Sequence, residues 1–164
     1  MCQHRDVAFR DGDGWVFCTQ CNNRHWGLHG AAGLLLIRTD LPEPRVLLQL
    51  RAAWTHGGGT WALPGGALDS HEDSATAAAR EAHEEAGIEP HHLSIKTIFS
   101  DDHGNWKYDT VIAHTSGDAG AYLSNEESED LHWVLIGDVQ TYELHPGLAA
   151  SWPTLKQAVS DTLN

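Results

Sequence analysis

The chain has 164 residues, which is enough for one domain with a sizeable hydrophobic core. Hydrophobic residues make up 41% of the chain and charged residues 20%, as in an ordinary globular protein. The net charge of −13 comes from 10 Lys and Arg against 23 Asp and Glu. Because so negative a surface repels phosphate backbones, we expect no long nucleic acid as a partner, and a nucleotide polyphosphate would need cations to bind.

The sequence also argues against a membrane protein. The longest apolar run, Ala31 to Ile37, has the length of a strand and not of a membrane span. The N-terminus lacks the basic region followed by an apolar core that marks a signal peptide. We therefore expect a cytoplasmic protein with no membrane partner. A homodimer is left open.

Residues 1–23 predict a small N-terminal appendage that contains all three cysteines, ahead of a main domain over 24–164. In a reducing compartment, cysteines in close pairs with histidine indicate metal ligands, and this set suits a tetrahedral structural Zn²⁺. Trp15–Phe17 would form the hairpin strand of this knuckle, and His25 is an alternative fourth ligand. We expect most of the other histidines at the surface. The proposed zinc ligands are Cys2, His4, Cys18 and Cys21.

The main domain begins with two apolar runs, Ala31 to Arg38 and Arg45 to Arg51, which predict a pair of strands joined by a turn. A short strand follows at Trp61 to Leu63. The segment 73–86 lacks Gly and Pro and predicts a helix that ends at Gly87, a residue suited to a left-handed cap.

The second half of the chain continues the alternation of strands and loops. Further strands are expected over 93–100, 107–115 and 131–136. Ser151 is the expected cap of a final amphipathic helix, in which Trp152, Leu155, Val159 and Leu163 follow helical spacing. Strands flanked by a few helices predict an α/β sandwich with a mixed sheet.

Three carboxylates share one face of the expected helix, because Glu81, Glu84 and Glu85 stand at positions i, i+3 and i+4. Like charges at these spacings repel each other, and in the last half of a helix the dipole also opposes them. Hard divalent cations bound by oxygen would compensate the charge. A solvated acidic face is the alternative interpretation.

The surrounding pattern decides between the two. Gly66 is followed after five residues by Glu72 and after seven more by the run Arg80 to Ile88, Arg-Glu-Ala-His-Glu-Glu-Ala-Gly-Ile. This pattern resembles the Nudix box at every fixed position, and Pro64-Gly65-Gly66 at its entrance is also typical of the Nudix family. The resemblance implies a Nudix-type α/β/α sandwich with a mixed sheet, here with a small N-terminal Cys/His knuckle.

The same resemblance implies the roles of the box residues. Glu81, Glu84, Glu85 and the backbone carbonyl of Gly65 would bind Mg²⁺ or Mn²⁺, and Glu84 and Glu85 would act in catalysis. Glu72 and Arg80 would form a structural brace, with direct metal binding by Glu72 as the alternative.

Family members often use one more Glu before a late strand, as a metal ligand or general base in catalysis, and Glu127 fits that place, with Glu126 as the second choice. A solvated acidic turn is the alternative.

The substrate is less well defined by the sequence. The proline that would mark an ADP-ribose hydrolase falls on His103 or Gly104, and the motif of NADH pyrophosphatases is missing. Aromatic and cationic residues between the strands could form a base and phosphate pocket, although such aromatics are more often part of the core. The candidate substrate-binding residues are Arg51, Trp61, Trp106 and Lys107.

The resemblance therefore implies a Mg²⁺-dependent hydrolase of a small-molecule nucleotide. The leading expectation is cleavage of a nucleoside diphosphate linked to another group. The first alternative is a house-cleaning nucleoside triphosphate pyrophosphatase of the oxidised dGTP type. A non-catalytic nucleotide-sensing module is the alternative of another class.

Overall fold

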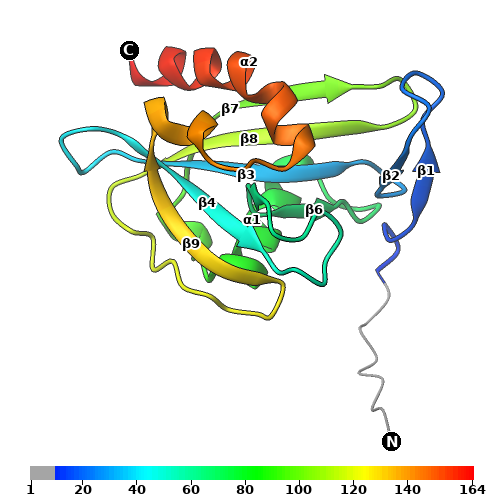
Figure 1. Cartoon of the computed structure of the whole chain (residues 1–164), viewed down its shortest axis with the longest axis horizontal. Coiled ribbons are helices and arrows are strands. Elements are labelled where there is room, and N and C mark those ends of the chain that lie inside the picture. Colours follow the sequence, from blue (N-terminus) through cyan, green and yellow to red (C-terminus); the bar gives the residue numbers. More distant parts are fainter. Residues whose placement is uncertain (1–9) are drawn as a thin grey trace, which may run out of the picture.

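The computed structural model describes residues 10–164 (Figure 1), so Cys2 and His4 lie outside the described residues. A small antiparallel sheet of β1 (Trp15–Phe17) and β2 (Arg24–Trp26) comes first. The main sheet contains seven strands: β3 (Ala31–Arg38), β4 (Arg45–Arg51), β5 (Trp61–Ala62), β6 (Gly65–Ala67), β7 (Ser94–Asp102), β8 (Lys107–Thr115) and β9 (Ser128–Leu135). The helices are α1 (Ser74–Ala86) and α2 (Pro146–Leu163), with short 3-10 helices at Pro90–His92 and Ile136–Thr141.

The main sheet is mixed, as predicted. Its order is β5-β4-β3-β8-β7, with β6 also paired to β3 and β9 to β4. The central pair of β3 and β8 is parallel, in register from Ala31 opposite Tyr108 to Arg38 opposite Thr115, and the other pairs are antiparallel. A strand in the middle of a sheet covered on both faces can be apolar throughout, which explains the buried run of β3.

The two helices cover opposite faces of this sheet, which confirms the predicted sandwich. Alternate residues of β3 point to opposite sides. Leu34 and Leu36 belong to one core cluster, in which small alanines of α1 let the helix lie close to the sheet. Leu35 and Ile37 belong to the other, with Trp152, Leu155 and Val159 of α2. In Figure 1, α2 lies above β7 and β8.

Three elements differ most from the sequence-based expectation. Helix α2 begins at Pro146, where the side chain of His145 accepts a hydrogen bond from the N–H of Gly147, so the expected cap at Ser151 is wrong. The Pro-Gly pair looks like a helix breaker, but proline is well suited to the first helical position because its missing N–H has no partner there. Strand β9 begins three residues before the expected start, at Ser128. Strand β6, rich in glycine, was not expected at all.

Within the described part of the chain, no helix combines the length and the apolar character that a membrane span requires.

Candidate active site

Helix α1 is fixed at both ends by caps that the sequence encodes. At its start, the Asp73 side chain accepts a hydrogen bond of 2.7 Å from the N–H of Thr76. At its end, Gly87 has φ of 66° and its N–H turns back to the last carbonyls of the helix, as a left-handed cap does. These caps hold the last two turns, which carry the three glutamates, against the sheet.

Glu85 is a buried carboxylate beside the box entrance. It is 5% exposed, and its Oε2 accepts hydrogen bonds from Gln49 Nε2 at 2.9 Å and from the N–H of Gly65 at 3.1 Å. Burial, with the nearby charge of Glu81, raises the pKa of Glu85 to about 8, although the two hydrogen bonds act in the opposite direction. Among residues 10–164, no cationic side chain forms an ion pair with this carboxylate.

Glu81 lies between Gly66 and Arg80. A Cβ at Gly66 would stand 2.5 Å from Glu81 Oε1, so a larger residue there would displace this carboxylate from its present position. Burial raises the pKa of Glu81 above its ordinary value, despite an ion pair of 2.8 Å between its Oε1 and Arg80 Nη1.

Glu84 is more exposed than the other two carboxylates. It contacts Arg10 Nη2 at 2.7 Å and Arg80 Nη1 at 3.6 Å. Glu81 and Glu85 are partly desolvated carboxylates with raised pKa, Glu84 lies on the same helix, and these side chains and the backbone carbonyl of Gly65 offer oxygen donors. This chemistry fits Mg²⁺ or Mn²⁺.

Arg80 and Glu72 form a two-point ion pair. Arg80 Nε and Nη2 contact the two carboxylate oxygens of Glu72 at 2.8 and 2.7 Å, and Nη2 also donates to the carbonyl of Ala67 at 3.1 Å. Glu72 accepts a further hydrogen bond from the N–H of Asp69 at 2.9 Å. The hydrogen bonds from Arg80 hold the pKa of Glu72 below its usual range. The pair joins α1 to the loop before it, the geometry that a brace requires.

Glu127 lies in the exposed loop before β9, next to Glu126. Its backbone carbonyl accepts a hydrogen bond of 2.9 Å from the N–H of Ala52. Its charge adds to the rise in the pKa of both Glu81 and Glu85, which places it on the side of the carboxylates. Its role in the reaction stays a prediction.

Arg51 and Trp61 lie on neighbouring strands, β4 and β5. Arg51 Nε donates to the carbonyl of His56 at 2.9 Å, and its charge acts on the Tyr108 phenol, as that of Glu85 does. The Trp61 ring centroid lies 4.4 Å from that of His132, in a wall of packed aromatic side chains. Arg51 is therefore the better placed of the two to meet a phosphate.

Trp106 and Lys107 are engaged elsewhere. The Trp106 ring stacks on His25 of β2, with centroids 4.1 Å apart. Lys107 Nζ forms an ion pair of 3.2 Å with Asp109, which in turn accepts a hydrogen bond from Ser74 at the start of α1. Because Glu85 lies eleven residues further along that helix, about 16 Å by the helical rise, Lys107 is separated from the carboxylates.

Sequence reasoning missed two polar residues. Buried Asp109 joins α1 to the sheet, since it accepts hydrogen bonds from Ser74, Lys107 and, at 2.6 Å, Ser100. The hydroxyl of Tyr108 lies so close to Gly33 that a Cβ there would be 2.1 Å away. A glycine inside an otherwise apolar strand signals such a close approach, so Gly33 was the available clue to Tyr108.

A second group of ligand atoms lies away from the glutamates. Cys18 and Cys21 gather with His25 and His103, and one ligand atom from each lies within 4.8 Å of every other. In residues 10–164 this Cys/His cluster is the only set of three or more His, Cys, Asp or Glu side chains that converges so closely. The structure thus brings two of the expected zinc ligands together with the alternative ligand His25, and adds His103, which was not expected as a ligand.

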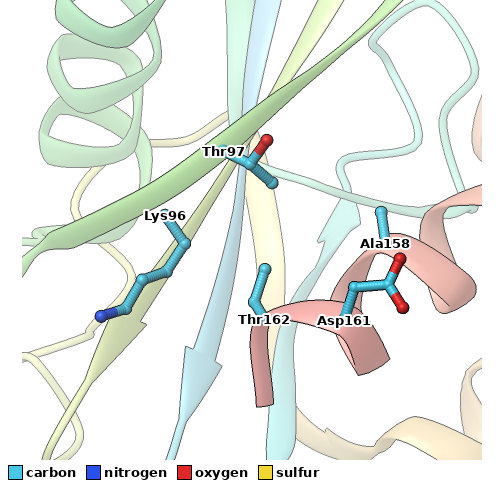
Figure 2. Close-up of a pocket in the computed structure, with 5 residues that line it drawn as sticks. All are labelled: Lys96, Thr97, Ala158, Asp161 and Thr162. Atoms are coloured by element: carbon cyan, nitrogen blue, oxygen red, sulfur yellow. The ribbon is translucent and has the colours of Figure 1, made fainter. Parts of the chain in front are cut away.

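The larger of two shallow surface depressions does not border the carboxylates. It holds about 400 Å³ between β7 and α2, on the sheet face opposite α1. Figure 2 shows its lining residues, Lys96, Thr97, Ala158, Asp161 and Thr162. One lysine and one aspartate do not provide the donor set that a polyphosphate needs, so we assign no function to this depression.

Comparison with known proteins agrees with the geometry. The model of the NUDIX domain matches residues 27–157. The chain is 46% identical over 159 residues to "Putative 8-oxo-dGTP diphosphatase 3" of Mycobacterium tuberculosis, covering 90% of this chain and 70% of that protein.

Two further relatives support the same assignment. A "Nucleoside triphosphate pyrophosphatase/Nudix hydrolase fusion protein" of Bifidobacterium longum is 40% identical over 150 residues, which cover 87% of this chain but 30% of the fusion protein. Among solved structures, the Nudix hydrolase RenU of M. smegmatis superimposes with a TM-score of 0.84 at 46% identity, covering 92% of this chain and 96% of that one. With its box glutamates packed at the end of α1 and its mixed sheet between two helices, the chain belongs to the Nudix family of hydrolases, enzymes that cleave phosphoanhydride bonds of small nucleotide substrates.

Proposed function

We propose that this enzyme hydrolyses an oxidised purine deoxynucleoside triphosphate, with release of the nucleoside monophosphate and pyrophosphate. The single observation that carries the reaction type is buried Glu85, held beside Gly65 and Glu81 with no ion-pair partner among the residues that the structure describes. The name of the mycobacterial relative, 46% identical over 90% of this chain, moves the oxidised triphosphate ahead of the diphosphate-linked compound that the sequence alone favoured.

Metal binding would fall to Glu81, Glu84, Glu85 and the carbonyl of Gly65. Bound Mg²⁺ or Mn²⁺ would neutralise the polyphosphate and lower the pKa of a coordinated water. One of these ligands is already oriented by the fold, since Gln49 Nε2 and the N–H of Gly65 fix Oε2 of Glu85.

The remaining residues would position the helix and the substrate and would deprotonate the attacking water. The ion pair of Arg80 and Glu72 holds the helix against its preceding loop. Water attacks the α-phosphorus, and its oxygen forms the new P–O bond. The bond from the α-phosphorus to the oxygen that bridges it to the β-phosphorus breaks. Pyrophosphate leaves with the bridging oxygen, and Glu127 accepts the proton of the water as general base. Arg51 would hold a phosphate outside the metal ligands.

The experiment is a product analysis with the whole chain in Mg²⁺ or Mn²⁺. The substrates are 8-oxo-dGTP, dGTP, ADP-ribose and a dinucleoside polyphosphate, and anion exchange with mass spectrometry identifies the products. We expect pyrophosphate and 8-oxo-dGMP, formed faster than the products of dGTP. Faster cleavage of ADP-ribose or the dinucleotide would instead support the diphosphate-linked class.

Matched variants separate the residue assignment from the substrate assignment. Glu85→Gln should abolish cleavage of every substrate, whereas Glu89→Gln, at a side chain 51% exposed, should leave it unchanged. Equal activity of Glu85→Gln and the wild type would refute the assignment of Glu85. Binding of a nucleotide without cleavage by the wild type would refute the proposed reaction and favour the sensing module.

A further inference from the structure

The Cys/His cluster, defined above as Cys18, Cys21, His25 and His103, is built from two distant parts of the chain. Cys18 Sγ lies 3.6 Å from His103 Nδ1, and Cys21 Sγ lies 3.1 Å from His25 Nε2. The two thiols are free, so no disulfide explains their approach. Two thiolates and two imidazoles within one small volume are the donor set of a tetrahedral zinc site.

The backbone around the two cysteines is shaped to aim both thiols inward. The N–H of Cys18 donates to the carbonyl of Asn23 at 2.8 Å, and the N–H of Asn22 donates to the carbonyl of Cys18 at 2.9 Å. Asn22 has φ of 58°, the left-handed conformation that closes the turn between β1 and β2. Asparagine adopts this conformation more readily than most residues, so the turn suits its sequence.

His103 reaches the cluster from the turn between β7 and β8. Its Nε2 lies 3.3 Å from Asp101 Oδ2, which leaves Nδ1 directed toward Cys18. A histidine that binds zinc usually donates its other ring nitrogen to a carboxylate or carbonyl, and this contact sets the tautomer. Asp101 thus occupies the place of that partner.

The hairpin of β1 and β2 needs an additional link to the domain. Its strands have three residues each, and Trp15, Phe17 and Trp26 are 46%, 56% and 41% exposed. A two-stranded hairpin with so little buried apolar surface is marginally stable in water. Besides the contacts within the Cys/His cluster, the hairpin meets the β7–β8 turn through the hydrogen bond of 2.8 Å from Asn105 Nδ2 to the carbonyl of Phe17 and the stacking of His25 on Trp106.

We propose that Cys18 Sγ, Cys21 Sγ, His25 Nε2 and His103 Nδ1 bind one structural Zn²⁺ that fastens the N-terminal hairpin to the β7–β8 turn. Four protein ligands complete the tetrahedron and leave no position for water or substrate, so the site is structural. Two thiolates balance the charge of the ion. Cys2 and His4, the other ligands suggested by the sequence, are not needed.

The first test is the zinc content of the purified full chain, measured by mass spectrometry together with the number of reduced thiols. We expect one equivalent of Zn²⁺ in the wild type and in Glu85→Gln, because the glutamates of α1 are separate from the Cys/His cluster. Less than half an equivalent with the thiols reduced would overturn the proposal.

Variants then identify the ligands. His103→Ala and Cys18→Ser should weaken zinc binding by more than about 10-fold, since loss of an outer partner alone costs about 10- to 100-fold. The controls His29→Ala, Cys2→Ser and His4→Ala should keep the wild-type zinc content. Loss of zinc from Cys2→Ser or His4→Ala, with retention in His103→Ala, would assign the ion to the other ligand set and refute ours.

Cobalt substitution keeps the proposal testable if a variant does not fold. Wild-type protein reconstituted with one equivalent of Co²⁺ should show the intense visible bands of tetrahedral cobalt and a thiolate-to-cobalt charge-transfer band. A weak octahedral spectrum without the thiolate band would contradict the proposed ligands.

Discussion

The carboxylate site, formed by Gly65, Glu81, Glu84 and Glu85, and the Cys/His cluster collect their ligands in different ways. The three glutamates lie within two turns of α1. The Cys/His cluster joins residues 85 positions apart, Cys18 and His103. Helical periodicity puts the glutamates on one face of α1, whereas only docking of the hairpin on the β7–β8 turn brings His103 to the cysteines. The residues of a site on one element can therefore be predicted from the sequence, whereas those of a site between elements can be predicted only in part.

The two sites also differ in how their charge is compensated. In the carboxylate site, burial raises the pKa of Glu81 and Glu85, and the arginines satisfy the set incompletely. If the glutamates bind Mg²⁺ as proposed above, this incomplete compensation would suit an ion that is taken up and released during turnover. In the Cys/His cluster, four donors of two types would satisfy one Zn²⁺ completely, which suits an ion that stays bound.

Among variants that keep all three glutamates, the largest effect on the carboxylate site is expected from Gly66→Ala. The new Cβ would stand 2.5 Å from Glu81 Oε1 and displace the carboxylate. Because a misplacement of about 1 Å can cost about 100-fold in rate, kcat/KM should fall by about that factor. The measurement is Mg²⁺-dependent hydrolysis. Gly117→Ala is the control, since nothing lies within 4 Å of its Cβ, and equal activity of the two variants would contradict the role of Glu81.

A smaller effect is expected when the brace is broken by Glu72→Gln. Arg80 would lose its two-point partner, and the free energy of unfolding should fall by about 2 kcal/mol, the scale of a hydrogen bond to a charged group. Urea unfolding measures the change. Asp40→Asn, which breaks the more exposed pair with Arg38, should cost less than about 1 kcal/mol. An equal loss of unfolding free energy in both variants would show that the brace contributes no more to stability than an exposed ion pair.

Asp109 can be compared with Glu81 and Glu85, because it is also a buried carboxylate but accepts hydrogen bonds from three side chains. Burial acts to raise the pKa of Asp109, but the hydrogen bonds from Ser100, Ser74 and Lys107 outweigh it and hold the pKa below its usual range. A lowered pKa stabilises the fold above the ordinary carboxyl pKa, and this contribution is lost as the pH falls through the lowered value.

Asp109→Asn should therefore lower the free energy of unfolding at pH 7 by about 1 to 2 kcal/mol, with a smaller difference from the wild type in strong acid. Urea unfolding at both pH values measures this. A difference that grows toward acid pH would have the wrong sign for this explanation.

The smallest effect is expected from Arg10→Ala, which tests the contact between the N-terminal segment and the carboxylate site. Arg10 is 41% exposed and pairs with Glu84 and Asp69. The free energy of unfolding should fall by less than about 1 kcal/mol, as for other exposed pairs. Because Glu84 is released, the Mg²⁺ concentration for half-maximal rate should fall by about 2-fold. A rise in that concentration would mean that Arg10 helps to bind metal or substrate.

Much of the fold could be predicted from local patterns. The apolar run of β3 and the Gly- and Pro-free segment of α1 each predict their element directly. The two-glycine strand β6 was not predicted, because its pairing with β3 depends on the close approach of Gly65 to Gly33 and not on side-chain pattern. The start of α2 was misplaced because Pro146 both begins helices and breaks them.

The candidate sites follow the same division. The box glutamates could be named from spacing and family resemblance, and their roles remain predictions. His103 had no signal in the sequence, because no other ligand of its cluster lies near it in the chain. Trp106, named as a substrate residue, stacks on His25, a contact that only the docking of the hairpin creates, and its substrate role stays a prediction.

The parallel pairing of β3 with β8 has a consequence for the order of assembly. The whole Nudix box lies between Ala31–Arg38 and Lys107–Thr115 in the chain, inside the long loop that this central pair closes. Closing such a loop loses entropy before long-range contacts repay it, so pairs of this kind form slowly. During synthesis the ribosome delivers the box well before β8. We therefore expect the glutamates to remain unorganised in a nascent chain that stops before Lys107, and to acquire metal affinity in one step when the sheet closes.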